Sequence, residues 1–508
     1  MEDAYRELRE RLATISDLSN AAAVLEWDQQ TMMPRNGGAA RADELGTLAR
    51  VAHELASSAE IGHLLDAIEP RAKSLDPDSD EACLVRVVRR DYEKTRRVPA
   101  ELRAAMTRAA SLAVPVWVEA RRRSDWGMFL PHLEHALELR RRYLACFEPA
   151  DEAYDILLDD FERGMKTAEV RAVFDKLKTG LVPLIAEIAG RADAVDDSFL
   201  QGVFPVEGQR KVEAAILAAF GFSQDSWRLD ETVHPFATGS GPDDIRLTTR
   251  HREDSLHALF GTMHEFGHGL YEHGIDRSLY RTPLGGGTSL GIHESQSRMW
   301  ENLVGRSRPF WQRFFPELQE AFPGALRGVD AELFYRAVNR VRPSLIRIEA
   351  DEATYNLHII LRFELEQAML SGAVAPRDVP EAWEAKVREY LGIQVSDIAS
   401  GALQDTHWAS GYIGYFPTYA LGNIVSAQIW ERIQAEIPDL DGQIRGGEFG
   451  SLRQWLRGHI HRHGRKFMPM DLLRKVTGSG LDPQPLLHYL RDKLGGIYGL
   501  PPHPSASS

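Results

Sequence analysis

The sequence predicts a mainly α-helical fold with one small β-sheet, and three observations support this. Apolar residues recur at three- and four-residue spacing over residues 5–25, 100–120, 126–147, 167–189 and 212–220, which is the period of a helix that buries one face. A short region near residue 245 has the alternating pattern of a strand instead. The composition, with 43% hydrophobic and 26% charged residues, is that of an ordinary globular protein.

The length of 508 residues suits one large helical unit, because long helical enzymes bury a large core beside a cleft. We therefore expect a single helical domain over residues 1–508 with a cleft between two lobes. A flexible tail is expected over residues 499–508, where proline and serine gather. No stretch approaches the roughly 18 apolar residues of a membrane span, so no membrane role is expected.

Charge and cysteine content favour a cytoplasmic protein that does not bind nucleic acid. The net charge is −14, whereas binding to phosphates needs a basic surface. Arginine runs at residues 121–123 and 140–142 have acids nearby and are expected on solvated helix faces. The first residues mix both charge signs, so no secretion signal is expected. Cys83 and Cys146 are too few for a disulfide framework and are expected to be buried free thiols.

The predicted strand lies in a region rich in turn residues. His234, Pro235 and Phe236 lead into a Gly-Ser-Gly-Pro loop at residues 239–242, and residues 245–249 read as a strand. We expect a small sheet here that lines a cleft, with His234 at its border and in reach of substrate.

Two helices, expected at about residues 255–273 and 292–304, flank a glycine-rich loop at residues 283–288 that lacks the Gly-Lys-Ser/Thr of a phosphate-binding loop. The first helix contains His264, Glu265 and His268 in a His-Glu-x-x-His pattern. Four residues advance a helix by about 400°, so the two histidines lie about 40° apart on one face. Glu265 is turned by about 100° from His264, which suits a general base that holds the water of a zinc site.

The His-Glu-x-x-His motif also arises by chance, so a third metal ligand decides whether these residues are interpreted as a metal site. His273 is rotated by about 140° from His268, and the metzincin pattern fails because residues 271 and 274 are not glycine and histidine. Glu294, which opens the helix after the loop, completes a site of two histidines and one glutamate with an open position. Such a site would hold one Zn²⁺ per chain and could accept Co²⁺ or Mn²⁺. His293 is expected to face the cleft or to support a ligand.

A second histidine group, at His459, His461 and His463, is a weaker candidate for metal binding. His459 and His463 have helical spacing, but basic residues at positions 457, 462, 465 and 466 surround them and the segment contains no carboxylate. A structural or surface role is expected for this group.

Six motifs in order along the chain give it a family resemblance. They are His234-Pro235-Phe236, Asp244-Ile245-Arg246-Leu247-Thr248, His264 to His268, His293-Glu294-Ser295-Gln296, Ile346-Arg347-Ile348-Glu349-Ala350-Asp351, and Gly401-Ala402-Leu403-Gln404-Asp405-Thr406-His407-Trp408. Residues 27–34 and 415–419 also resemble family segments. The set resembles that of the Taq-type (thermostable carboxypeptidase 1) zinc metallocarboxypeptidases, with no departure at the motif positions.

The resemblance implies a helical zincin fold of the neurolysin and angiotensin-converting enzyme type, with a deep groove closed at one end that limits substrate length. It also implies a homodimer that releases single amino acids from the C-termini of peptides with broad specificity. These properties come from the resemblance and not from composition or spacing.

A carboxypeptidase must hold the substrate's α-carboxylate, for which an arginine is well suited. The resemblance favours Arg347 for this role; the alternative is a helix-surface ion pair with Asp351, four residues later. Arg246 is a second candidate, although beside Asp244 it could instead shape the closed end of the groove.

Peptide hydrolysis also needs hydrogen-bond donors for the oxyanion that forms on the scissile carbonyl. His407, Tyr412 and Tyr415 fit this need, and Gly411 and Gly414 allow close approach. A histidine and the tyrosines after it fill such roles in the related helical peptidases, so the resemblance favours Tyr415 first and Tyr412 second. The alternative is that these are ordinary core or rim residues.

Two other functions stay open from the sequence. The first is an oligopeptide endopeptidase with the same fold and metal site. The second is a non-catalytic peptide-binding protein with a vestigial metal site, against which the intact Glu265 and Glu294 speak.

Overall fold

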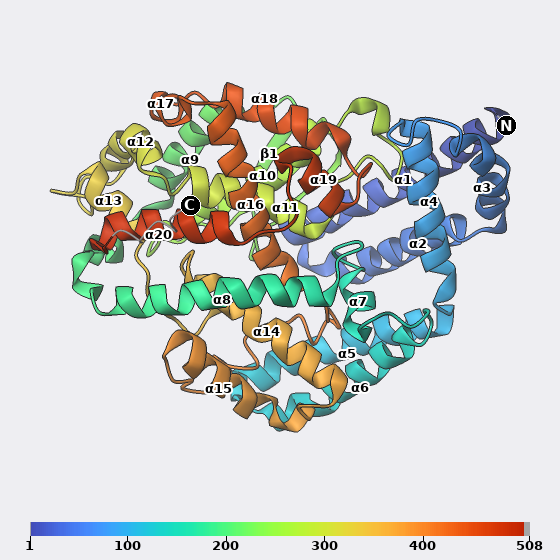
Figure 1. Ribbon diagram of the computed structural model, residues 1–508, viewed down its shortest axis with the longest axis horizontal. Helices are drawn as coiled ribbons and strands as arrows, with labels where there is room; N and C mark the ends of the chain where they lie inside the picture. The colour runs from blue at the N-terminus through green and yellow to red at the C-terminus, as the bar shows by residue number, and fades with distance from the viewer. Residues whose placement is uncertain (1, 502–508) are drawn as a thin grey trace. The chain divides into compact units, whose positions relative to one another are not determined.

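The computed structural model describes residues 2–501, and helices make up most of them (Figure 1). The chain forms two compact units. The first unit comprises Met1–Arg96, Asp197–Tyr335 and Ile429–Gly478, and the second comprises Arg97–Asp196, Arg336–Gln428 and Ser479–Ser508. The mainly helical fold with one small sheet agrees with the prediction from the sequence, whereas the cleft between two lobes stays a prediction.

The first unit contains the sheet. Its elements are α1 (Glu2–Thr31), α2 (Gly38–Ala56), α3 (Ala59–Ala72), α4 (Asp80–Arg97), α9 (Val206–Phe220), β1 (Trp227–Glu231), β2 (Ala237–Gly241), β3 (Asp244–Thr249), α10 (His257–Gly274), α11 (Leu290–Arg298), α12 (Arg308–Ala321), α17 (Leu440–Gly446), α18 (Gly450–His459) and α19 (Pro469–Thr477). The last residue of α4 belongs to the second unit, and helices α13 (Ala331–Val338) and α16 (Pro417–Glu436) also contain residues of both units.

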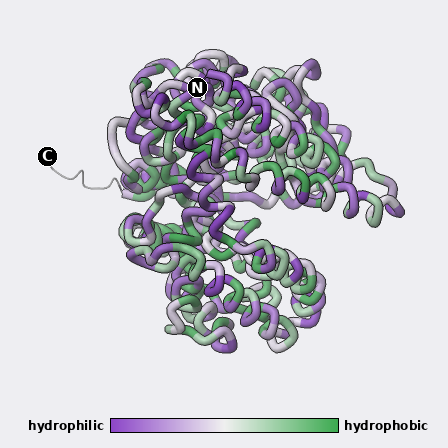
Figure 2. The backbone as a smooth tube through the Cα atoms, turned by 90° about the vertical axis from the view of Figure 1, so that its right-hand side faces the viewer, coloured by the Kyte–Doolittle hydropathy of each residue, from purple (hydrophilic) through white to green (hydrophobic). Residues whose placement is uncertain are grey.

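Among its described residues, the second unit contains helices and connecting loops but no strand. Its helices are α5 (Ala100–Arg123), α6 (Trp126–Leu144), α7 (Ala153–Leu158), α8 (Thr167–Ala189), α14 (Thr354–Ser371), α15 (Val379–Leu391) and α20 (Gln484–Tyr498). Helix α8 has the bounds that the apolar period predicts, and polar and apolar residues follow one another at short intervals along such helices (Figure 2). The predicted tail begins after α20, and from residue 502 it lies outside the described residues.

One predicted helix differs in its second half. The segment expected to be helical at residues 292–304 is α11 only as far as Arg298, and Met299–Val304 continues it as a π-helix. A π-helix has a wider turn than an α-helix, so side chains after Arg298 point in directions that the α-helical period does not give.

The three-stranded sheet has the order β1-β3-β2, with β1 parallel and β2 antiparallel to β3. One face of it packs on α10. The side chains of Ile245 and Leu247 on β3 and of Trp227 on β1 are buried there, and they meet α10 at Gly269, where a Cβ atom would lie 2.6 Å from the Trp227 ring. The missing side chain therefore lets the helix come close to the sheet.

The other face of the sheet packs on α1. Arg228 of β1 and Arg246 of β3 are register partners, and both guanidinium groups lie over the ring of Trp27, at 4.3 and 4.5 Å from its centroid. Cation–π contacts of this kind fix the ring and both arginines together. The sheet is thus held between α1 and α10.

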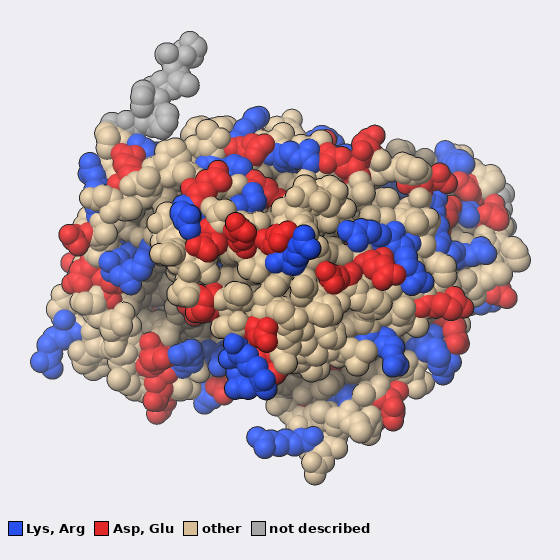
Figure 3. Space-filling model, turned by 90° about the horizontal axis from the view of Figure 1, so that it is seen from below, with Lys and Arg blue, Asp and Glu red and all other residues tan. Residues whose placement is uncertain are grey.

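The surface carries both charge signs interspersed on the face shown in Figure 3. Arg122 and Arg123 are exposed and pair with Glu119, as predicted for a solvated helix face. Arg140 differs from that prediction, because its Nε donates a hydrogen bond of 2.9 Å to the Gly411 carbonyl. Among the described residues, no helix combines the length and the apolar character that crossing a membrane requires. Both cysteines are free thiols, although only Cys83 is fully buried.

Candidate functional site

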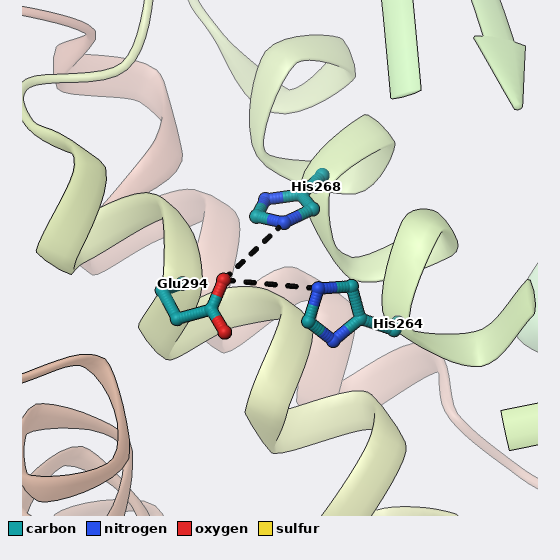
Figure 4. A group of neighbouring side chains, drawn as sticks. All are labelled: His264, His268 and Glu294. Atoms are coloured by element: carbon teal, nitrogen blue, oxygen red, sulfur yellow. Dashed lines mark ion pairs between the residues drawn. The ribbon is translucent and has the colours of Figure 1, made fainter. Parts of the chain in front are cut away.

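Two close-packed helices present the predicted metal ligands. Helix α10 carries His264 and His268 one turn apart, and α11 carries Glu294 in its second turn (Figure 4). The helices come close at Gly267, where a Cβ atom would lie 2.5 Å from the Gln296 carbonyl oxygen. The hydroxyl of Ser289 caps the start of α11 by accepting from the Ile292 N–H. Small residues and a capped helix start therefore bring the carboxylate opposite the imidazoles.

The three ligand atoms converge on one point. The Nε2 atoms of His264 and His268 each lie 3.7 Å from Glu294 Oε2, and all three residues offer ligand atoms within 4.8 Å of one another. Donor atoms that bind zinc tetrahedrally at their usual bond lengths lie about 3.3–3.6 Å apart. The spacing therefore fits a zinc-sized cation, and within residues 2–501 no second group of this kind occurs.

Each ligand histidine has an outer partner on its other ring nitrogen. His264 Nδ1 lies 2.8 Å from Glu301 Oε2, and His268 Nδ1 lies 3.2 Å from His293 Nδ1. His293 is in turn held by Glu272, at 2.7 Å between Nε2 and Oε1. Hydrogen bonds of this kind orient metal-binding imidazoles and fix the tautomer whose Nε2 faces the ion.

Arg298 ties the carboxylates of the site together. Its Nε donates to Glu294 Oε1 at 2.7 Å and its Nη1 to Glu301 Oε2 at 3.1 Å, so that Glu294 Oε2 faces the histidines. Burial alone would raise the pKa of Glu301, but the charge of Arg298 and the bond with His264 outweigh it and hold that pKa well below its ordinary value. These contacts therefore favour the ionised form of Glu301 beside His264.

Glu265 has the environment of a general base. It follows His264 on α10, its residue is 8% exposed, and burial raises its pKa to about 7. A carboxyl group with a pKa near the working pH can both accept and return a proton.

In the second unit, Arg347 is firmly held. Its Nε and Nη2 donate to Asp405 Oδ1 at 3.0 and 2.9 Å, and its Nη1 donates to the Tyr355 hydroxyl at 3.0 Å. These bonds use three of the five guanidinium N–H donors. The alternative ion pair with Asp351 is wrong, since that carboxylate accepts from Thr354 and from the Arg342 backbone.

The predicted oxyanion residues form one aromatic group in the second unit. Tyr415 stacks on Tyr412 at a centroid distance of 5.8 Å and lies 5.3 Å from the His407 ring. Burial lowers the pKa of His407 to about 4, so its imidazole is neutral near pH 7. Tyr412 is 48% exposed. Gly411 and Gly414 both have positive φ, 75° and 96°, a conformation that favours glycine.

The family is shown by comparison with known proteins. The family model of carboxypeptidase Taq (M32) metallopeptidases matches residues 7–494. Thermostable carboxypeptidase 1 of Thermus thermophilus is 44% identical over 98% of this chain and 99% of its own. The chain belongs to the M32 metallocarboxypeptidase family. Carboxypeptidase 1 of Bacillus subtilis is 38% identical to this M32 chain, over 97% of it and 98% of its own length.

Solved structures agree with this assignment. The M32 carboxypeptidase of Deinococcus radiodurans R1 superimposes with a TM-score of 0.95 at 41% identity, over 98% of this chain and 100% of that one. The carboxypeptidase of Pyrococcus furiosus gives 0.93 at 36% identity, over 97% and 99%. The M32 chain is therefore a metallocarboxypeptidase with the helical zincin fold that the sequence predicted, and its family implies a divalent metal.

Other predicted residues of the M32 chain have different surroundings. Arg246 donates to both carboxylate oxygens of Asp244, at 2.9 and 3.0 Å, as well as lying over Trp27. His234 is exposed in the connection between β1 and β2. His273 is not a ligand: its Nδ1 lies 2.6 Å from the Pro242 carbonyl oxygen.

The second histidine group has the structural role that was expected. His459 stacks on Trp455, and His463 packs on Phe467. His461 is buried, and its Nε2 lies 2.8 Å from Gln296 Oε1, two residues after the ligand Glu294. The middle histidine thus supports the helix that carries the third ligand.

The sequence did not reveal four residues around the metal centre: Glu272, Arg298, Glu301 and His461. The contact of Arg298 with Glu294 could have been predicted, because Arg298 lies one helical turn after Glu294. Glu301 lies beyond the start of the π-helix, and His461 reaches the site from another segment. Glu272 lies on α10 one turn after His268, but its partner His293 is on α11. Their roles follow from packing and not from local spacing.

The outer partner Glu301 gives a first testable prediction. Glu301→Gln keeps the shape of the side chain but removes the charge beneath His264, so metal affinity is expected to fall roughly 10- to 100-fold. Competition with a chromophoric chelator measures this. Glu320→Gln, which alters an exposed surface pair with Lys211, is the matched control. Equal affinity of both variants would show that Glu301 does not tune the ligand.

Proposed function

We propose that this M32 enzyme removes single residues from the C-termini of peptides with one zinc ion held by His264, His268 and Glu294. The convergence of these three ligand atoms, with 3.7 Å between each imidazole Nε2 and the carboxylate, carries the proposal. Co²⁺ and Mn²⁺ are possible substitutes, because a site of two histidines and a carboxylate is not selective.

When bound, zinc acts as a Lewis acid on water and on the scissile carbonyl. The protein supplies the proton transfers. Glu265 takes a proton from the attacking water and gives it to the leaving amine, and the raised pKa of its buried carboxyl suits both steps. Glu301 and His293 keep the two imidazoles in the orientation in which Nε2 faces the ion.

Arg347 is the proposed partner of the substrate's α-carboxylate. Asp405 fixes its guanidinium, which leaves the remaining N–H donors in a defined direction. Since Arg362 also pairs with Asp405, at 2.5 Å, the charges of the two arginines outweigh the effect of burial and lower the pKa of that carboxyl. Arg246 and His234 are weaker candidates for substrate contact, and Arg246 is already engaged by Asp244.

Tyr415 is the proposed donor to the oxyanion, with Tyr412 and the neutral His407 as further donors. A phenol O–H and the ring N–H of a neutral imidazole are both hydrogen-bond donors. The exposure of Tyr412 and the stacking of its ring on Tyr415 support a place at the surface where a substrate binds.

A homodimer and a cytoplasmic location are further proposals, which rest on the family resemblance and on the sequence. Light scattering of the purified enzyme tests the first, and fractionation of the native cells tests the second.

One digestion separates a carboxypeptidase from an endopeptidase of the same fold. A peptide with a free C-terminus is expected to lose residues one at a time from that end, whereas its C-terminally amidated copy should be cut at least about 100-fold more slowly, because a charge-assisted bond to an arginine is lost. Mass spectrometry of both digests provides the measurement. Internal fragments from both peptides would favour the endopeptidase.

A further inference from the structure

One buried carboxylate in the second unit has no place in the chemistry described so far. Glu366 of α14 is 0% exposed and accepts hydrogen bonds from three neutral donors. These are the Tyr154 hydroxyl at 2.6 Å, the Trp408 indole N–H at 2.8 Å and the Gly414 backbone N–H at 2.9 Å. The carboxylate of α14 therefore holds both α7, through Tyr154, and the stretch that contains Trp408 and Gly414.

Two of these donors adjoin the predicted oxyanion residues. Trp408 directly follows His407, and Gly414 directly precedes Tyr415. A single side chain thus holds both ends of the segment 407–415, one through a side-chain donor and the other through the backbone. Displacement of Glu366 would release the residues on either side of both bonds.

The middle of the segment is held as well. The Arg140 guanidinium donates to the Gly411 carbonyl, and Gly414 packs so closely on α7 that a Cβ atom would lie 2.8 Å from the Leu157 backbone. One turn before Glu366 on α14, Arg362 donates to Asp405, at 2.7 Å from Nε to Oδ2. The same helix therefore holds the chain at Asp405, just before the segment, and at Trp408 and Gly414 within it.

The burial of the Glu366 carboxylate requires a physical explanation. Burial of an ionisable group away from water is unfavourable, and here it raises the pKa of Glu366 to about 7. An ionised carboxylate only accepts hydrogen bonds, so it can satisfy all three donors together. A glutamine would turn its NH₂ group toward one or more of them. The arrangement therefore suits a residue whose role is to hold its three hydrogen-bond donors in fixed positions.

We propose that Glu366 is a positioning residue that sets the place of Tyr415 and His407 by holding the segment 407–415 at both ends. This role rests on the proposed function, in which Tyr415 and His407 donate to the oxyanion. Donors to an oxyanion act only when they are placed before the reaction begins, and a small displacement of a catalytic group lowers the rate strongly.

Glu366→Gln tests the role in the full-length, metal-loaded enzyme. Its kcat on a free-acid peptide is expected to fall roughly 10- to 100-fold. KM should stay within about twofold, because Arg347 is fixed by Asp405 and not by Glu366. Metal content should be unchanged, and amide hydrogen exchange should speed up in residues 407–415.

Glu364→Gln is the matched control. It alters a carboxylate on the same helix whose partners are instead Lys178, at 2.7 Å, and Tyr390, at 2.5 Å. Its kcat is expected to stay at the parental value. If Glu366→Gln keeps the kcat of this control, the positioning role is overturned.

Two further variants separate this proposal from the oxyanion role itself. Trp408→Phe removes one donor to Glu366 and keeps an aromatic ring, so it should lower kcat several-fold even if Glu366→Gln does not fold. An unchanged kcat of Trp408→Phe would count against the proposal.

Tyr415→Phe removes the proposed oxyanion donor. If Tyr415→Phe loses kcat and Glu366→Gln does not, only the positioning role fails. If Tyr415→Phe keeps its kcat, the oxyanion role fails and the positioning role with it.

If both Tyr415→Phe and Glu366→Gln lose kcat, the double variant decides between positioning and a separate effect. A loss smaller than the product of the two single losses is expected, since residues that act through one another are not additive. A loss equal to that product would show that Glu366 does not act through Tyr415.

Discussion

Glu265→Gln is expected to lose peptide hydrolysis while it keeps a full complement of metal. Glutamine has nearly the shape of glutamate but cannot accept and return a proton, and general-base catalysis contributes about 10²- to 10⁴-fold to rates. Because Glu265 is rotated by about 100° from His264 on α10 and is not among the three converging ligands, kcat should fall by about 10³-fold or more at parental metal stoichiometry. Steady-state kinetics and metal analysis measure both quantities.

Two controls make this result specific. Glu265→Asp keeps a carboxylate on a shorter side chain and is expected to retain more activity than the glutamine variant. Glu320→Gln removes an exposed carboxylate on α12 and should leave kcat unchanged. Normal turnover by Glu265→Gln would mean that another residue is the base.

Glu294→Ala is expected to have the second-largest effect, through loss of metal. It removes one of the three proposed ligands and the only anionic one, so metal affinity should fall by more than the roughly 10- to 100-fold typical of outer partners. Activity should decline in parallel and recover partly at high metal concentration. Isothermal titration or competition with a chelator measures the affinity.

Thermal unfolding gives an independent measurement of the same loss. A ligand that binds only the folded state stabilises it, by about 2.7 kcal/mol at a hundredfold excess over Kd. Chelation should therefore lower the unfolding temperature of the parental enzyme and leave that of Glu294→Ala nearly unchanged. If Glu294→Ala bound metal with parental affinity, the third ligand would have to be another residue.

Several features of the site could be predicted because they depend on local spacing. His264 and His268 are four residues apart, and a helix alone brings such residues to one face. The same helix sets the direction of the Glu265 side chain relative to the two histidines. The bounds of α8 and the strand β3 follow from apolar periods of 3.6 and 2 residues.

Other features could not be predicted from spacing. The contrast is clearest at Arg347, where the sequence offered Asp351, four residues away, as an ion-pair partner. The partner is instead Asp405, 58 residues away along the chain. The supports of the metal ligands show the same limit, since Glu272 acts through His293 and His461 through Gln296.

The sequence by itself thus determined the helical class and, through the family resemblance, the carboxypeptidase reaction, and it supplied His264, His268 and Glu294 as the predicted metal ligands. Only the tertiary structure decided which carboxylates orient the imidazoles, that α11 runs into a π-helix, and that Glu366 holds the segment 407–415. The physical reason is that helical geometry fixes neighbours three and four residues apart, whereas contacts between distant segments depend on how whole helices pack, which no short pattern encodes.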